Sequence, residues 1–405
     1  MGPESTKNST DKSQASKELL LIFILTFLFF TGYNMILPIL PIYIVSIGAS
    51  KLELGFIMAT IPATSIIARI PFGILMDKVG RWSITLLALT LQLFAYIMFS
   101  LTPPVHTLYL TAVVYALAIS SFGPSVIAIA LDAAPLGSKG SVMGRFYASI
   151  GASMVLGPLI TSLLTYHYTY QTVFTFTLTL PAVGLAALLT FRGFSIKPAR
   201  SGVSSIQDRP VISSLKRIIL QRNILLLSAA SVTFFISLGV FETMFPIYVK
   251  EDLALETYYV GLLFAVRGVP NAFSRIPAGI MADRIGRRIP LIISYSLTFT
   301  ALFILPTAKN IYLLMLLIGL YGFAWGARTA PSAALYSDNV SSLDTGFVST
   351  IIWLTSDVAM ALGSSLAGAL TMFFSIPQII MLSSILLLPG LFLILMISES
   401  KNRVS

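Results

Sequence analysis

The sequence predicts an all-α integral membrane protein with twelve transmembrane helices arranged as two pseudo-symmetric six-helix bundles. Of its 405 residues, 56% are hydrophobic and only 10% are charged, and the mean hydropathy is +0.89. A water-soluble domain of this size needs more charge on its surface. One crossing of a bilayer takes about 20 apolar residues, and such segments follow one another along the whole chain.

The apolar segments define the expected domains. The predicted helices cover residues 19–45, 52–76, 83–102, 108–131, 145–166, 170–191, 224–249, 257–282, 289–307, 311–337, 346–374 and 376–397. We therefore expect a disordered cytoplasmic tail at 1–18, an N-terminal bundle at 19–192, a cytoplasmic linker at 193–222, a C-terminal bundle at 223–398 and a cytoplasmic tail at 399–405.

The distribution of basic residues predicts the orientation in the membrane. With both termini in the cytoplasm, the outer loops hold only Lys51, Lys250 and Lys309 of the 26 Lys and Arg residues. Cytoplasmic loops of membrane proteins carry an excess of basic residues. The net charge of +10 is thus explained by membrane topology, and we expect no nucleic-acid partner.

The two halves of the chain repeat each other. The thirteen residues from Arg69 to Arg81 recur 206 positions later, from Arg275 to Arg287, and eight of the thirteen are identical. Each half has an even number of helices, so both halves have the same orientation in the membrane. Such parallel repeats move against each other around a site near the midplane.

The repeated stretch carries a recognisable motif. The pattern Gly73-x-x-x-Asp77-Lys78-x-Gly80-Arg81 resembles the signature between helices 2 and 3 of the major facilitator superfamily, and this resemblance extends over residues 19–397. The second copy has Gly279, Asp283, Gly286 and Arg287 at the same positions. The glycines allow a tight turn, and the opposite charges can clamp neighbouring helices. In the family this latch holds the outward-facing state; the alternative is simple anchoring of helix ends at the interface.

Two further patterns are similar to the drug:proton antiporter branch of that family. The first helix contains Asn34-x-x-x-Pro38-x-x-Pro41-x-Tyr43, with Asn at a position where the branch often has an acid. On the fifth helix, Gly157 and Pro158 match the centre of the antiporter motif, whose remaining glycines are replaced here by other small residues. We expect Gly157 and Pro158 to allow close helix packing.

Charged residues inside the predicted helices indicate functional positions, because a charge at the bilayer centre costs about 3 kcal/mol or more. They are Arg69, Glu242, Arg267, Arg275, Arg328 and Asp357. Two of them, Arg69 and Arg275, are repeat partners, which favours a shared scaffold role. The other four have the uncharged partners Ile36, Ile61, Phe122 and Gly151 in the first half.

Depth along the helices predicts how these charges are used. Arg267 and Asp357 both fall near the midplane, and we expect them to form an ion pair. Burial disfavours an ionised carboxyl group, whereas a nearby Arg favours it, so an acid whose surroundings alternate can bind and release a proton. We assign proton coupling to Glu242 and Asp357, with Glu242 as the carrier. The alternative is a structural role for all three residues.

These observations favour a secondary active transporter that works by alternating access. Its expected substrate cavity includes Asn34, Gln92, Tyr33, Arg267 and Arg328. The resemblance implies proton-coupled efflux of drug-like or amphiphilic compounds. The alternative is a proton-coupled symporter for an organic anion or other metabolite, with Arg267 or Arg328 binding the carboxylate of an anion.

The remaining classes of function fit the sequence poorly. It has no His-Glu-x-x-His, no Gly-x-Ser-x-Gly and no phosphate-binding glycine loop, so we expect neither an enzyme nor a cofactor. With 2 His and 0 Cys residues, a metal site is not expected. The expected partners are a small-molecule substrate, protons and the lipid bilayer of the cell membrane, and we expect a monomer.

Overall fold

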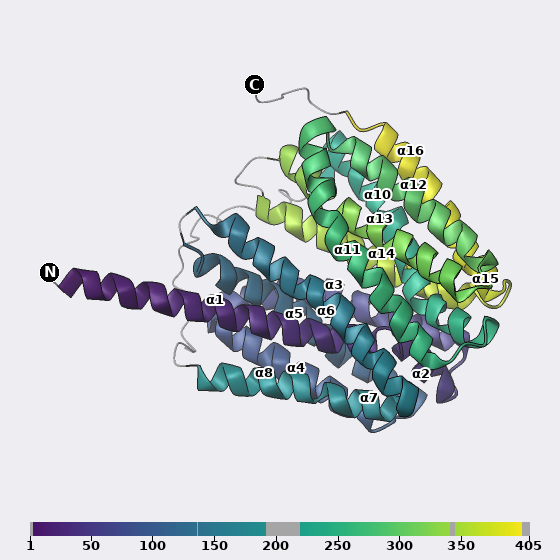
Figure 1. Cartoon of the computed structure of the whole chain (residues 1–405), viewed down its shortest axis with the longest axis horizontal. Coiled ribbons are helices and arrows are strands. Elements are labelled where there is room, and N and C mark those ends of the chain that lie inside the picture. Colours follow the sequence, from purple (N-terminus) through teal and green to yellow (C-terminus); the bar gives the residue numbers. More distant parts are fainter. Residues whose placement is uncertain (1–2, 136, 192–218, 341–344, 399–405) are drawn as a thin grey trace. The chain divides into compact units, whose positions relative to one another are not determined.

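The computed structural model describes residues 3–135, 137–191, 219–340 and 345–398, and all of their regular elements are helices (Figure 1). In the first half these are α1 (Pro3–Ile36), α2 (Leu40–Ser46), α3 (Lys51–Val79), α4 (Arg81–Ser100), α5 (Val105–Asp132), α6 (Lys139–His167), α7 (Tyr170–Thr177) and α8 (Thr179–Thr190). In the second half they are α10 (Arg222–Ile247), the π-helix η1 (Tyr248–Asp252), α11 (Thr257–Ile285), α12 (Arg288–Ile304), the 3-10 helix η2 (Leu305–Thr307), α13 (Ile311–Asp338), α14 (Thr345–Leu370), α15 (Ile376–Ile385) and α16 (Leu387–Leu395).

The fold class predicted from the sequence is confirmed. Each predicted segment corresponds to one helix or to two consecutive pieces of one broken helix. Most of the predicted linker, up to residue 218, and the tail at 399–405 lie outside the described residues.

Prolines explain where several of the helices break. Proline cannot donate the backbone hydrogen bond to the residue four positions earlier, and its ring crowds that carbonyl group. Accordingly α7 ends at Thr177, four residues before Pro181, and α15 ends at Ile385, four residues before Pro389. The first predicted segment breaks after Ile36. The next residue, Leu37, is four positions before Pro41.

Eleven helices in the described part of the chain are long and apolar enough to cross a membrane. The predicted eighth segment, α11, is not among them although it has 29 residues. It carries Arg267 and Arg275 in its interior and Asp283 and Arg284 near its end. These charges lower its hydropathy, and they include Arg267 of the expected substrate cavity and Asp283 of the second latch motif.

The N-terminal segment differs from the prediction. We expected residues 1–18 to be disordered, yet α1 begins at Pro3 and continues without a break into the first apolar segment. Proline is favoured in the first turn of a helix, where its missing N–H has no partner to lose. The apolar part that can span the membrane begins at Ala15.

The helices form two compact units. Their bounds differ from those of the predicted bundles mainly because residues 41–63 belong to the second unit. The first unit comprises residues 1–40 and 64–202, and the second comprises 41–63 and 203–405. The first part of α3 belongs to the second unit because Gly55 lies directly against Gly368. A methyl group on Gly55 would lie 2.6 Å from the Gly368 Cα atom. Lys51 also forms an ion pair with Glu251, 2.6 Å away.

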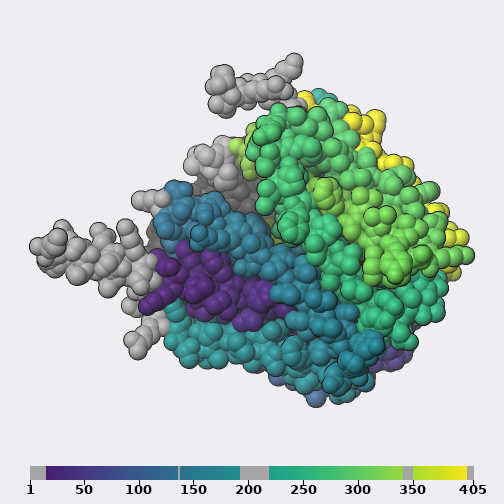
Figure 2. Space-filling view, viewed as in Figure 1, coloured from purple at the N-terminus to yellow at the C-terminus, as the bar shows by residue number. Residues whose placement is uncertain are grey.

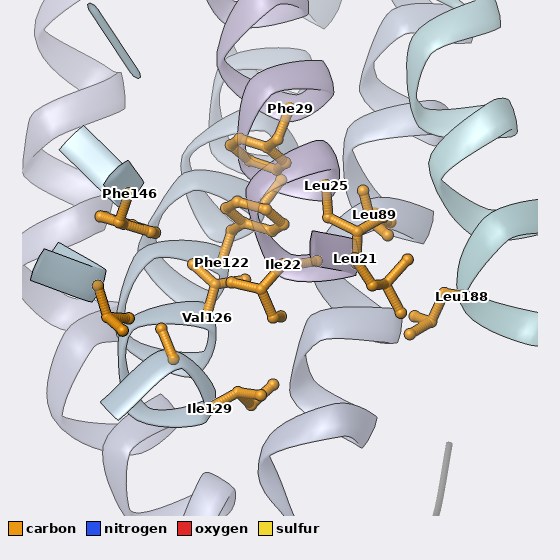
Figure 3. Close-up of a cluster of buried hydrophobic side chains, with 14 residues drawn as sticks. Leu21, Ile22, Leu25, Phe29, Leu89, Phe122, Val126, Ile129, Phe146 and Leu188 are labelled. Atoms are coloured by element: carbon orange, nitrogen blue, oxygen red, sulfur yellow. The ribbon is translucent and has the colours of Figure 1, made fainter. Parts of the chain in front are cut away.

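A cluster of apolar side chains forms the core of the first unit (Figure 3). Leu21, Ile22, Leu25 and Phe29 of α1 point into it, and Phe29 stacks on Phe122 of α5 with ring centroids 3.8 Å apart. In the space-filling view, the exposed side of α1 is flanked by other helices of its unit (Figure 2).

Glycines set the closest helix contacts, and the repeat reproduces one of them. A methyl group on Gly157 of α6 would lie 2.8 Å from the carbonyl oxygen of Thr31 in α1. At the repeat offset of 206 residues, a methyl group on Gly363 of α14 would overlap the carbonyl oxygen of Ile236 in α10. Each unit therefore joins its first and fifth membrane helices by the same backbone contact.

A second glycine contact, between α11 and α13, positions the charged residues of the second unit. A methyl group on Gly322 would overlap the carbonyl oxygen of Arg267, and one on Gly326 would overlap that of Asn271. Only glycine permits backbones to approach so closely. The side chains that flank these glycines on α13 therefore surround Arg267.

We predict that Gly322→Ala destabilises the protein, because the added methyl group forces α11 and α13 apart. Overpacking of this kind costs about 1–3 kcal/mol. The matched control is Gly319→Ala on the same helix, where the new methyl group would meet Pro270 at 3.8 Å, an ordinary contact. Thermal unfolding of the purified variants in detergent measures the difference. Equal melting temperatures for the two variants would contradict the packing described here.

Candidate functional site

A buried ion pair lies inside the second unit. Glu242 on α10 and Arg267 on α11 approach to 3.5 Å between Oε1 and Nη1. Glu242 is 5% exposed and Arg267 is 2% exposed. Both charges are thus removed from solvent, and each is the counter-ion of the other.

Aromatic rings enclose the guanidinium group of Arg267. Its Cζ atom lies 4.4 Å from the ring centroid of Phe264, 5.1 Å from that of Trp325 and 5.6 Å from that of Phe241. Attraction between a cation and a ring face reaches about 2 kcal/mol in a desolvated site. The rings therefore stabilise the charge of Arg267 whether or not Glu242 is ionised.

The ion pair is loose in comparison with well-formed bonds between Arg and a carboxylate. Well-formed bonds between Arg and a carboxylate are about 2.7–2.9 Å long and often bidentate. Here the contact is 3.5 Å, and neither Nη1 nor Nε of Arg267 has a hydrogen-bond partner among the described residues. The buried hydroxyl of Tyr321, whose ring is 4.6 Å from that of Phe241, has no such partner either. The site thus has unused hydrogen-bonding capacity that a proton, water or ligand could fill.

The structure gives Arg267 a different partner from the one we expected. The residues of similar depth, Arg267 and Asp357, were expected to pair, but Arg267 lies against Glu242. Asp357 is buried on α14 at 7% exposure. Of the two acids assigned to proton coupling, Glu242 thus forms the ion pair with Arg267.

Arg328 occupies a second buried position in the same unit. Its Nη2 donates a hydrogen bond of 2.8 Å to the Ser231 hydroxyl, and its guanidinium lies 4.5 Å and 4.7 Å from the ring centroids of Phe234 and Phe235. It is 6% exposed, and its Nε has no hydrogen-bond partner in the part of the chain that the structure describes. No carboxylate within the described ranges lies at ion-pair distance from it.

The cavity residues predicted in the first half are used mainly to join helices. Asn34 donates to the Phe30 carbonyl at 2.8 Å and to the Ser153 hydroxyl at 3.2 Å, which ties α1 to α6. Gln92 donates to the carbonyl of Phe29 at 3.0 Å and to the Tyr96 hydroxyl at 2.8 Å. Among the three predicted residues, only Tyr33 is partly exposed.

The latch motif has the same geometry in both halves. Arg81 forms an ion pair with Asp132 at the end of α5, and 206 residues later Arg287 forms one with Asp338 at the end of α13, where Nε and Oδ2 are 3.3 Å apart. Arg287 also pairs with Asp283. The hydrogen bond to Asp283, supported by Asp338, raises the pKa of Arg287, so its charge is fixed.

The glycines that precede these arginines have a conformation that other residues rarely adopt. Gly80 has φ 93° and ψ 152°, and Gly286 has φ 103° and ψ 159°. This region of the backbone map is essentially restricted to glycine. The latch therefore requires glycine at both positions for steric reasons.

Sequence reasoning missed three residues of these sites. The acids Asp132 and Asp338 are separated by the repeat offset of 206 residues, so the repeat itself was a usable signal. Tyr321 lies one helical turn from Trp325 on the same face of α13, and this spacing could have identified it.

We predict that the buried pair behaves as a coupled unit in unfolding experiments. Glu242→Gln leaves Arg267 without a counter-ion, and loss of one partner of a buried pair costs about 3–5 kcal/mol. Arg267→Met costs less, because Glu242 can take up a proton whereas Arg cannot lose one. The Glu242→Gln/Arg267→Met double variant should be more stable than Glu242→Gln. Additive losses of melting temperature would show that the residues do not interact.

Comparison with known proteins agrees with this architecture. A profile of the Major Facilitator Superfamily matches residues 22–266 and 229–405. The quinolone resistance protein NorA of Staphylococcus aureus (strain MSSA476) is 22% identical over 361 residues, covering 88% of this chain and 90% of NorA. An uncharacterised MFS-type transporter of Methanocaldococcus jannaschii is 28% identical over 367 residues, covering 86% and 88% of the two chains.

Solved structures show the same fold. The nucleoside transporter NupG matches with a TM-score of 0.80 at 13% identity, over 95% of this chain and 100% of NupG. A bacterial homologue of the human lysosomal transporter Spinster, inward-facing and occupied, matches with a TM-score of 0.76 at 14% identity, over 94% and 96%. The chain therefore belongs to the Major Facilitator Superfamily and is a multi-pass membrane transporter, not an enzyme.

Proposed function

We propose that this transporter exports drug-like or amphiphilic compounds in exchange for protons, with Glu242 as the proton carrier. The observation that carries the proposal is the loose, buried pair of Glu242 and Arg267 in one half only. The repeat-related positions in the first half are Ile36 and Ile61. Since the scaffold of that half needs no charge at these positions, the pair serves a purpose other than folding.

The surroundings of Glu242 provide a physical basis for proton exchange. An apolar environment favours a neutral carboxyl group, and a nearby guanidinium favours the ionised form. In alternating access, helices move relative to one another, so a contact of 3.5 Å can lengthen in one state and shorten in the other. Proton uptake follows separation from Arg267, and release follows renewed contact. While Glu242 is protonated, the aromatic rings stabilise the charge of Arg267.

The proposed substrate class rests on the relatives and on the sequence patterns. The name of the NorA relative refers to quinolone resistance, and the first-helix and fifth-helix patterns are similar to those of drug:proton antiporters. Aromatic side chains of the second unit, such as Trp325 and Phe235, offer surfaces on which an amphiphilic molecule can stack. We place the protein in the cell membrane with both termini in the cytoplasm, in agreement with the distribution of basic residues.

A second candidate function is proton-coupled uptake of an organic anion. The observation that favours it is Arg328, a buried cation with no carboxylate partner among the described residues. Both candidates use Glu242 for coupling. They differ in whether the substrate moves with the proton or against it, which flux measurements distinguish.

The latch motifs are proposed to control the change between states. We infer that the Arg81–Asp132 and Arg287–Asp338 pairs hold helix ends together in one state of the cycle and separate in the other. Their side chains are partly exposed to solvent, at 23% and 66% in the first pair and 25% and 54% in the second. Such pairs add little stability, so their value lies in the rate of conformational exchange.

We predict that Glu242→Gln abolishes proton-driven transport but leaves substrate exchange intact, because glutamine cannot carry a proton. The measurement is internal pH in proteoliposomes with an imposed proton gradient, recorded while organic cations, neutral amphiphiles or carboxylates are added. Substrate exchange without a gradient verifies that the variant is folded. Should Glu242→Gln lose exchange as well, the more stable Glu242→Gln/Arg267→Met variant repeats the test.

The matched control is Glu256→Gln, which removes an acid whose Oε2 lies 3.6 Å from Lys250 Nζ in an exposed ion pair. It should retain wild-type coupling. Normal gradient-driven transport by Glu242→Gln would remove Glu242 from the mechanism.

We also predict that Asp338→Asn slows transport severalfold while it changes the free energy of unfolding by less than about 1 kcal/mol. The rate of substrate counterflow and the melting temperature together measure this separation of effects. A large loss of stability with an unchanged rate would indicate that the pair is only an anchor for helix ends.

A further inference from the structure

The second unit contains two buried guanidinium groups with different charge environments. Arg267 has the carboxylate of Glu242 at 3.5 Å, whereas Arg328 has only hydroxyl groups and rings around it. Neutral groups solvate a cation but leave its net charge uncompensated. The second unit thus contains a buried positive charge for which the described residues provide no counter-ion.

The groups around Arg328 do not use all of its hydrogen-bonding capacity. Its Nη2 donates to Ser231, and the hydroxyl groups of Tyr295 and Tyr336 also interact with it. Tyr295 donates its own proton to the Ala230 carbonyl at 2.7 Å. The Nε–H of Arg328 has no acceptor. A guanidinium with a free Nε edge is suited to bidentate binding of a planar carboxylate.

The rings beside Arg328 are suited to the apolar part of such a ligand. Phe234 is buried and packs on Tyr295, with ring centroids 5.6 Å apart, whereas Phe235 is only partly buried. The guanidinium therefore lies between a buried ring and a partly buried one. An aromatic carboxylate could contact Phe235 through its rings and Arg328 through its acid group.

The position of Arg328 relates it to the proposed proton site. On α10, Ser231 and Glu242 are 11 residues apart, and on α13, Tyr321 and Arg328 are 7 residues apart. At about 100° per residue both spacings return to nearly the same helix face, and at about 1.5 Å per residue they correspond to about 10–16 Å along the axis. The groups on α10 and α13 that surround Arg267 and those at Arg328 thus lie at two levels along the same faces of these two helices.

We propose that Arg328 binds the carboxylate of the transported compound, so that the preferred substrates are amphiphiles with an acidic group. The inference rests on the transport function proposed above but does not depend on proton coupling or on the direction of transport. It selects Arg328 from the two arginines because Glu242 already neutralises Arg267.

The test compares a quinolone carboxylic acid with its neutral carboxamide, which differs only at the acid group. Equilibrium binding of both is measured by calorimetry on the purified full-length protein without a proton gradient. We expect the wild type to bind the acid at least about tenfold more tightly than the amide. In Arg328→Gln the dissociation constant of the acid should rise to that of the amide, while that of the amide stays unchanged. Arg328→Lys should keep part of the preference.

The matched control is Arg275→Gln, another arginine inside a helix of the same unit, which donates to Asn271 at 2.9 Å. It should keep the preference for the acid. Equal affinity of the wild type for acid and amide would overturn the inference even if Arg328→Gln did not fold. A preference that persists in Arg328→Gln would also overturn it.

Discussion

A charge within the hydrocarbon region must be neutralised, solvated by protein groups or used in function, and this constraint organises the second unit. The close contact of α11 and α13 at Gly322 brings the ring of Trp325 to Arg267, and Phe264 lies beside Arg267 on α11 itself. That enclosure stabilises a buried cation beside the Glu242 carboxylate without fixing the carboxylate in a short, bidentate bond. A charge pair with such incomplete bonding can change its protonation state as the helices move.

The internal repeat separates the scaffold from the transport chemistry. Features present in both halves are mechanical: the glycine contacts at Gly157 and Gly363, and the ion pairs of Arg81 with Asp132 and of Arg287 with Asp338. The charges within the helices that are present in one half only are Glu242 and Arg267, which form a pair, and Arg328 and Asp357. The second half thus supplies the charges for which coupling and substrate binding are proposed.

Much of this arrangement can be predicted from the sequence, because length and hydropathy define membrane helices and the repeat defines their pairing. The partner of Arg267 could not be predicted in this way. Counting residues gives the depth of a side chain along its helix, but contact also requires the rotation of the helix about its axis. That rotation is set by packing at Gly322, whose role a single glycine in an apolar segment does not reveal. The helix at residues 3–18 was missed because its polar composition also suits a disordered tail.

If Glu242 carries the proton, its carboxyl group must change protonation state during transport. Infrared difference spectroscopy of the protein in lipid, recorded as substrate is added or pH is changed, detects the carbonyl vibration of a protonated carboxyl group directly. We predict a band for a protonated acid that changes with substrate or pH and is absent in Glu242→Gln. Identical difference spectra for the wild type and Glu242→Gln, under conditions where the wild type transports with protons, would contradict this role.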